Sequence, residues 1–281
     1  MPKKRKKVKP RIKLRTQKRA KAKPVKRISK TKTKPRISKE KAREDFLKKR
    51  ITSGIPGFDK LIDGGFVNES VCLVVGGAGS GKTIFATQFL LEGLRQNEPG
   101  VFITFEEKKD RFYNEMKTLG WDLTELEKKK KFAFIEYTPE QVKKMLQEGG
   151  GEVEVVIEEI KAKRIVIDSI TSFALLFESE LEKREAALAL FELLRKWKVT
   201  SILTLEHEPS MKKGSVRIST PLEFEVDGIV ILYFLRTNNE RIREFEILKM
   251  RGTEHSRGVF RFEIGKKGIK IKGKSKYIKI G

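Results

Sequence analysis

Gly76-Gly-Ala-Gly-Ser-Gly-Lys-Thr83 stands between a short apolar run, residues 71–75, and a helix-length segment that begins at Ile84. The pattern G-x-x-x-x-G-K-T lets the backbone N–H groups of a glycine-rich loop surround a chain of phosphates, because no Cβ atom blocks their approach. Lys82 is placed to reach the β- and γ-phosphates, and the hydroxyl of Thr83 to hold Mg²⁺. An apolar strand, a glycine loop and a helix in this order predict a nucleotide-binding site. The predicted nucleotide-binding residues are those of the loop and its successor, Gly76, Gly77, Ala78, Gly79, Ser80, Gly81, Lys82, Thr83 and Ile84.

Positive charge is concentrated at the beginning of the chain. The 281 residues have a formal net charge of +25, and residues 1–40 hold 20 lysines and arginines against one acid, Glu40. That segment therefore carries +19, and the other 241 residues carry only +6. Because it has few large apolar residues to bury, the segment 1–47 is predicted to form a disordered basic arm, separate from a globular domain at 48–281. Residues 1–45 are either a solubilising tail or an arm that binds polyanions, namely nucleic acid, without reading its sequence, or another acidic surface.

One cysteine, Cys72, lies inside the apolar run before the loop. A single cysteine cannot form a disulfide within the chain, which fits a reducing compartment. No apolar run reaches the roughly 18 residues of a membrane span. These features predict a cytoplasmic protein without a membrane partner, in which Cys72 is a core side chain and not a nucleophile.

Apolar runs of strand length alternate with helix-length segments, and hairpin-like strands follow near the end of the chain. This order predicts an α/β fold with a mostly parallel sheet, flanked by helices and extended by antiparallel C-terminal strands. The predicted strands are residues 71–75, 101–105, 132–136, 164–168, 201–205, 228–235, 241–250, 259–264 and 269–271. The predicted helices are residues 58–62, 84–94, 109–119, 140–146, 152–161 and 181–197. Residues 211–222 show little periodicity and are predicted to form a loop.

Acidic residues stand at the ends of two predicted strands. Asp168 ends one strand, where its carboxylate either holds Mg²⁺ or caps the next turn. Glu106 and Glu107 end another, which is expected to lie next to the strand before the loop. One of the two orients or deprotonates an attacking water, with Glu106 preferred, unless they are only a solvated acidic pair. The predicted site therefore combines Lys82 and a glutamate as catalytic residues with Thr83 and Asp168 at the metal.

A further pair of cations stands near the end of the predicted strand 241–250, in Lys249-Met-Arg251. Lys249 and Arg251 are either an exposed basic strand end or a phosphate sensor that acts across a subunit boundary, as an arginine finger does. The sequence alone leaves both interpretations open.

Five motifs in this order resemble the KaiC-like branch of the RecA-type ATPases. They are Arg50-Ile-Thr-Ser-Gly-Ile-Pro-Gly-Phe-Asp59, the loop at 76–83, Phe105-Glu-Glu107, Ile165-Val-Ile-Asp-Ser169 and Lys249-Met-Arg-Gly252. The resemblance spans about residues 48–265 and is to a single-domain protein of the archaeal type. It implies a RecA-type core, ATP and Mg²⁺ as ligands, and a homo-oligomer, with a hexamer favoured, in which ATP lies between neighbours. It also implies that Glu106 and Glu107 are catalytic and that Lys249 and Arg251 reach the neighbour's γ-phosphate.

The expected function is slow ATP hydrolysis by an oligomer that couples its nucleotide state to the binding of a protein partner or nucleic acid. Two alternatives stay open. One is a DNA- or RNA-binding, recombinase-like or regulatory protein for which ATP is mainly a structural ligand, with Lys212, Lys213 and Arg217 as loop contacts. The other is a protein kinase that uses the same pocket, because no motif marks the acceptor of the phosphoryl group.

Overall fold

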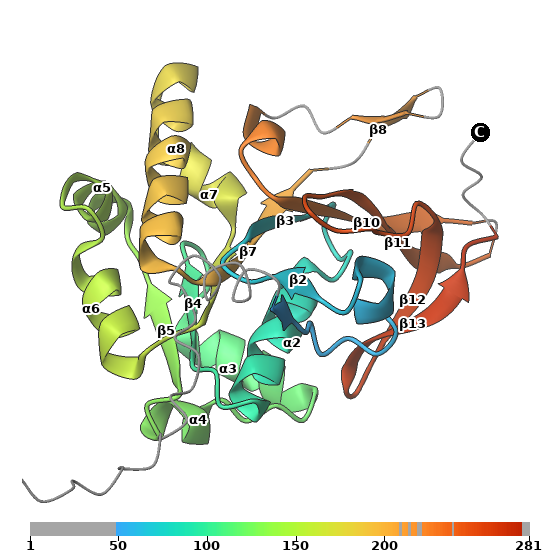
Figure 1. Cartoon of the computed structure of the whole chain (residues 1–281), viewed down its shortest axis with the longest axis horizontal. Coiled ribbons are helices and arrows are strands. Elements are labelled where there is room, and N and C mark those ends of the chain that lie inside the picture. The colour runs from blue at the N-terminus through green and yellow to red at the C-terminus, as the bar shows by residue number, and fades with distance from the viewer. Residues whose placement is uncertain (1–48, 208–209, 213–214, 218–220, 238, 277–281) are drawn as a thin grey trace, which may run out of the picture. The chain divides into compact units, whose positions relative to one another are not determined.

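A computed structural model describes residues 49–207, 210–212, 215–217, 221–237 and 239–276 (Figure 1). The predicted basic arm lies outside the described residues. In the part that is described, the main feature is a nine-stranded sheet in the order β13-β12-β11-β10-β3-β7-β6-β4-β5. Its strands are β3 (Val71–Gly76), β4 (Gly100–Thr104), β5 (Phe132–Glu136), β6 (Arg164–Asp168), β7 (Thr200–Glu206), β10 (Gly228–Arg236), β11 (Arg241–Met250), β12 (Val259–Gly265) and β13 (Gly268–Lys274).

The sheet is parallel from β10 to β5 and antiparallel from β10 to β13. The predicted α/β architecture with an antiparallel C-terminal extension is therefore confirmed. The helices are α2 (Lys82–Arg95), α3 (Lys109–Thr118), α4 (Thr124–Lys128), α5 (Pro139–Gln147), α6 (Gly151–Ile160), α7 (Ile170–Leu175) and α8 (Glu180–Trp197). The short elements are β1 (Arg50–Ile51), β2 (Phe66–Val67), β8 (Ser210–Lys212), β9 (Ser215–Arg217) and the 3-10 helices Asp59–Ile62 and Pro221–Phe224.

Helices cover both faces of the parallel sheet (Figure 1), so each face has its own apolar core. Cys72 and Val74 point into the core that α2 and α3 cover. Leu73 and Val75 point into the core that α5 to α8 cover. A strand buried on both faces needs apolar side chains at every position, which is why the run before the loop is continuous and not alternating.

Local signals fix the ends of the helices that cover the second face. Thr138 and Gln141 form a capping box at the start of α5, and Ser179 and Glu182 form one at the start of α8.

None of the helices in the described ranges is both long enough and apolar enough to cross a membrane.

Two predictions about the arrangement of the chain are wrong. The strand that precedes Glu106 and Glu107, β4, does not adjoin β3, because β7 and β6 lie between them. A crossover helix such as α2 can carry the chain past positions that later strands fill, so neighbours in sequence need not pair. The segment predicted as a loop at 211–222 contains the antiparallel pair β8 and β9. One of its predicted contacts, Lys213, lies outside the described residues.

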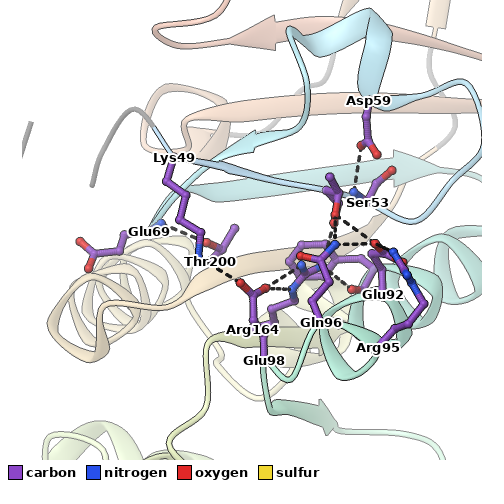
Figure 2. Close-up of polar contacts among 12 residues, drawn as sticks. Lys49, Ser53, Asp59, Glu69, Glu92, Arg95, Gln96, Glu98, Arg164 and Thr200 are labelled. Carbon is purple, nitrogen blue, oxygen red and sulfur yellow. Dashed lines mark hydrogen bonds and ion pairs between the residues drawn. The ribbon is translucent and has the colours of Figure 1, made fainter. Parts of the chain in front are cut away.

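A buried arginine ties the first described residues to the sheet (Figure 2). Arg164 is fully buried and donates from Nε and Nη2 to one carboxylate oxygen of Glu98, at 3.0 and 2.7 Å. Its Nη1 donates to the backbone carbonyls of Thr52 and Phe89, at 2.7 Å each. Lys49 reaches the other oxygen of Glu98 at 3.2 Å. The entry to the domain is therefore held by ion pairs and hydrogen bonds against α2 and β6.

Candidate nucleotide-binding site

The glycine loop lies at the carboxyl end of β3 and leads directly into α2. Gly76, the last residue of β3, is in register with Glu206 of β7 and Leu232 of β10. The carboxyl ends of parallel strands form one edge of a sheet, where ligands bind in α/β proteins. The loop therefore lies at the edge where Asp168 also ends its strand.

The glycines of the loop are required by close contacts and by backbone conformation. Gly79 and Gly81 have positive φ angles of 73° and 103°, which residues with a Cβ rarely adopt. A Cβ on Gly81 would lie 2.8 Å from Cδ1 of Ile264, and one on Gly76 would lie 2.6 Å from the carbonyl oxygen of Leu232. The loop is a cradle that side chains would fill, and its shape suits a phosphate chain.

Lys82 points across this cradle. Its Nζ donates to the carbonyl of Gly77 at 3.1 Å. Burial lowers the pKa of Lys82, and the charges of Glu206, Asp168 and Glu106 oppose that shift. Among the described residues, carboxylates at or just beyond strand ends thus balance the partly buried ammonium group, and a bound phosphate would add compensating negative charge.

Asp168 is held by hydroxyl groups on both of its oxygens. Thr83 donates to Oδ2 at 2.7 Å, and Thr204 of β7 donates to Oδ1. The hydroxyl oxygen of Thr83 and the carboxylate oxygens of Asp168 are hard ligands of the kind that Mg²⁺ prefers. Among the described residues, no group of three or more His, Cys, Asp or Glu side chains is placed to hold a metal alone. The donor set fits Mg²⁺ bound together with phosphate oxygens and water, the usual arrangement for this ion.

The acidic pair lies just beyond the end of β4. The backbone N–H groups of Glu106 and Glu107 both donate to Oγ1 of Thr104, at 3.3 and 3.1 Å. This turn frees the two side chains from the alternation of a strand. Glu106 is exposed and accepts a hydrogen bond from Ser169 Oγ at 3.3 Å. Both carboxylates therefore lie at the same edge as Asp168.

Glu107 differs from Glu106 in its surroundings. It is partly buried and lines the same cleft as Lys82 and Thr83. Burial raises the pKa of Glu107, the charges of Glu115 and Asp168 add to this rise, and Arg111 opposes it. A carboxylate with a raised pKa that faces the cleft is better placed as a general base than its exposed neighbour.

A cleft of about 440 Å³ extends from the glycine loop. Its far wall comes from α3 and from the C-terminal strands, which the sequence did not connect with the loop. The lining residues beyond the loop are Ile84, Glu107, Glu115, Met116, Thr118, Leu119, Arg243 and Ile264. The cleft joins the glycine cradle to a wall of mixed charged and apolar side chains, an arrangement that leaves room for a nucleotide with its phosphates at the glycines.

Lys249 and Arg251 lie at the opposite end of the sheet from the loop of the same chain. Met250, between them, pairs with Gly228, which pairs with Cys72 near the start of β3. Cys72 precedes Gly76 by four residues, or about 13 Å of strand. Lys249 donates to the carbonyl of Glu223 at 2.8 Å, and Arg251 donates to that of Phe224 at 2.7 Å. The structure thus does not bring these cations together with the other predicted site residues.

Besides the residues of α3 and β12 that line the cleft, sequence reasoning missed Thr104, Thr204 and Arg243. The threonines carry a weak signal, since each is a polar residue near the carboxyl end of an otherwise apolar strand. Arg243 carries no such signal, because it is one of three cations in a strand that is far from the loop in sequence.

Comparisons with known proteins identify relatives of this chain. Residues 51–276 match the sequence model of the KaiC ATPase family. The chain is 36% identical over 230 residues to the circadian clock protein KaiC3 of Synechocystis sp., covering 79% of this chain and 45% of that protein. It is 33% identical over 236 residues to a UPF0273 protein of Thermotoga maritima, covering 79% of this chain and 96% of that protein.

The fold has a solved counterpart in a KaiC-like protein of the hyperthermophilic archaeon Pyrococcus horikoshii. The two share 40% sequence identity with a TM-score of 0.71, over 80% of this chain and 99% of that chain. The chain spans about half the length of the circadian clock relative that it matches. The extent of the family match and the shared RecA-type α/β core show that the chain belongs to the KaiC family of ATPases.

Proposed function

We propose that this protein hydrolyses ATP slowly, as an oligomer of domains spanning residues 48–281, and couples its nucleotide state to the binding of a partner. The observation that carries the proposal is the joining of the glycine loop to a strand-end carboxylate by the 2.7 Å hydrogen bond between Thr83 and Asp168. A loop that only turned the chain would need neither this contact nor the hydrogen bond from Lys82 Nζ to the loop carbonyl of Gly77. The Glu107 carboxylate on the wall of the same cleft supplies a base.

Different residues would bind the phosphates, hold the metal and activate the water during transfer of the γ-phosphoryl group to water. The loop N–H groups and Lys82 bind the phosphates, and Thr83 and Asp168 would hold the metal. Magnesium, when bound, neutralises negative charge on the β- and γ-phosphates. Glu107, with Glu106 beside it, orients the attacking water and accepts its proton.

Release of phosphate from MgATP tests this proposal. Lys82→Ala removes a phosphate contact, and Glu107→Gln removes the base, which contributes roughly 10²- to 10⁴-fold in rate. We expect Glu106→Gln to reduce the rate less than Glu107→Gln. Equal turnover in the wild type and all three variants would rule the proposal out, and stable transfer of the labelled γ-phosphate to protein would instead support a kinase.

We further propose that the oligomer is a ring, with a hexamer favoured, in which Lys249 and Arg251 serve the neighbour's site. Two observations support a contact at this end of the sheet. The two cations lie away from their own loop, and the neighbouring Phe224 is 71% exposed. An exposed aromatic side chain beside cations is typical of a contact surface.

Mixing two inactive variants tests the shared site. Lys82→Ala lacks an intact loop but keeps the cations, and the double variant Lys249→Ala/Arg251→Ala has the reverse defect. Random mixing joins an intact loop to an intact cation pair at roughly a quarter of the interfaces of a head-to-tail ring. We expect activity to return on mixing to about that fraction, with light scattering to show the ring. No recovery, or a monomer with and without MgATP, would contradict the shared site.

A second candidate function is the binding of nucleic acid through residues 1–45. The net charge of +19 in residues 1–40 supports it. Binding through phosphate contacts weakens steeply with salt. Deletion of residues 1–45 is therefore expected to remove most salt-sensitive binding of DNA or RNA, and unchanged binding would reject the arm as the contact.

A further inference from the structure

The last two strands, β12 and β13, form a hairpin at one edge of the nine-stranded sheet (Figure 1). Residues 257–276, which we name the basic hairpin, hold eight lysines and arginines and one acid, Glu263, a net charge of +7. Residues 41–281 as a whole carry only +6. The excess positive charge outside the first 40 residues is therefore concentrated in this one hairpin.

Most cations of the basic hairpin are exposed and lack an acidic partner. Two have one: Nζ of Lys272 lies 2.8 Å from Oε2 of Glu263, and Nη2 of Arg261 lies 3.4 Å from Oε1 of Glu240. The hydrogen bond from Lys272 lowers the pKa of Glu263, and the charges of Arg261 and Lys270 add to this effect. The exposed cations that form no ion pair among the described residues are Arg257, Lys266, Lys267, Lys270, Lys274 and Lys276. The basic hairpin thus presents positive charge that its one acid does not neutralise.

Lysines on an edge strand can serve only to prevent another strand from pairing with it. In this protein the edge of β13 already has a partner, because the N–H of Ile271 donates to the carbonyl of Pro56 at 3.1 Å. Gly57 packs against the same residue, since a Cβ on Gly57 would lie 3.1 Å from Cβ of Ile271. Lys267 belongs to the turn between the strands and not to the edge. Protection of the edge therefore explains only part of the charge.

The other side chains of the basic hairpin indicate the kind of partner. In the described ranges it exposes no large apolar side chain, and its phenylalanines, Phe260 and Phe262, are buried in the core. A protein partner is expected to meet apolar or aromatic anchors at the centre of an interface, and unpaired bases stack on exposed aromatic rings. Phosphate groups need only cations and N–H donors. A nucleic-acid duplex, which presents phosphates and keeps its bases stacked, therefore fits this surface best.

We infer that the basic hairpin binds the phosphate backbone of a nucleic-acid duplex without reading its sequence. The inference rests on the proposed binding of nucleic acid, and it adds a contact on the folded domain to the one proposed for residues 1–45. β12 also contributes Ile264 to the wall of the nucleotide cleft. The duplex and the nucleotide would then contact the same hairpin, as expected if nucleotide state is coupled to partner binding.

Titration of the full-length protein with a labelled DNA duplex at several salt concentrations tests the inference. Each phosphate contact contributes about 0.9 to the slope of log affinity against log salt concentration. The variant Lys267→Gln/Lys270→Gln/Lys274→Gln removes three unpaired cations of the basic hairpin. We expect it to reduce the magnitude of the slope by roughly 2 to 3.

A matched control removes the same charge elsewhere. Lys161, Lys163 and Lys198 are exposed, form no ion pair among the described residues, and precede β6 and β7. Their replacement by Gln is expected to change the slope by less than about 1. Replacement of the three hairpin lysines by Arg keeps the charge and should keep the wild-type slope.

An unchanged slope in the Gln variant of the hairpin, or an equal fall in the control, would overturn the inference. A fall that the Arg variant shares would also overturn it, because the effect would not follow the charge. If light scattering shows that the Gln variant aggregates while its soluble fraction keeps the wild-type slope, the lysines only protect the edge. The proposed binding of nucleic acid fails separately, by absence of salt-dependent binding to the wild type. Binding that survives deletion of residues 1–45 and follows the hairpin lysines would reject the arm alone.

Discussion

Two arginine–glutamate pairs with the same chemistry lie in different environments, and this difference predicts their contributions to stability (Figure 2). Arg164 and Arg95 each donate from Nε and Nη2 to a glutamate, Glu98 and Glu92 respectively, at 2.7 to 3.0 Å. The side chain of Arg164 is 0% exposed, whereas that of Arg95 is 73% exposed. We expect Arg164→Met to destabilise the protein strongly and Arg95→Met to have no measurable effect.

The size of the Arg164→Met effect follows from what the substitution leaves behind. Glu98 keeps only Lys49 as a partner, and the carbonyls of Thr52 and Phe89 lose the donor that the arginine gave them. Breaking a buried pair on one side costs about 3–5 kcal/mol. At about 2–4 °C per kcal/mol for a domain of this size, the unfolding midpoint should fall by roughly 6–20 °C. Arg95 is in water, which replaces its hydrogen bonds when it is removed.

Thermal unfolding followed by circular dichroism, without nucleotide, compares the two variants directly. Replacement of both charges in Arg164→Met/Glu98→Met should recover much of the loss, because no buried charge then lacks a partner. Equal midpoints for Arg164→Met and Arg95→Met, or a double variant less stable than Arg164→Met, would refute the reasoning.

Three further predictions concern two site residues and the buried cysteine of β3. Because burial and like charges raise the pKa of Glu107, its ionised form opposes folding, so the stability that the group gives at low pH is lost as pH rises through the raised pKa. Glu107→Gln should therefore raise the unfolding midpoint more at neutral pH than in acid while it lowers ATP hydrolysis, and a lower midpoint at neutral pH would contradict this. Burial raises the pKa of the Cys72 thiol to about 12, so a thiol reagent should label the protein only after unfolding, and fast labelling of the native protein would disprove the burial. Thr204→Val removes a hydroxyl that orients Asp168 and should weaken the binding of Mg²⁺ in the nucleotide complex about 10- to 100-fold in a metal titration, whereas an unchanged titration would remove Asp168 from the metal site.

The sequence predicts the elements next to the glycine loop well because their signals are local. The loop follows a strand buried on both faces, and α2 begins at Lys82, directly after a glycine in the left-handed conformation. The order of strands in the sheet is not a local property, and for this reason β4 was placed wrongly beside β3. The acids at strand ends could be predicted as site residues because the carboxyl ends of parallel strands lie at one edge of the sheet. Which acid faces the cleft depends on the turn at Thr104, and no pattern in the sequence fixes that turn.

The residues on the far side of the cleft could not be predicted from local sequence signals either. Met116 and Leu119 follow a helical spacing that fits a core helix equally well, and Ile264 and Arg243 belong to strands that pair only after the chain has closed. Contacts across such long sequence separations cannot be inferred from one sequence by periodicity. They require the register of β10, β11 and β12, which the structure supplies.

The central claim is that the glycine loop with Lys82 binds a magnesium-complexed nucleoside triphosphate. Calorimetric titration of the purified chain with MgATP, beside the Lys82→Ala variant, measures it most directly. We predict one binding event per chain for the wild type and a loss of affinity on the order of 100-fold in the variant, as expected when a charged contact to phosphate is removed. The absence of binding to the wild type, or equal binding by both proteins, would contradict the claim.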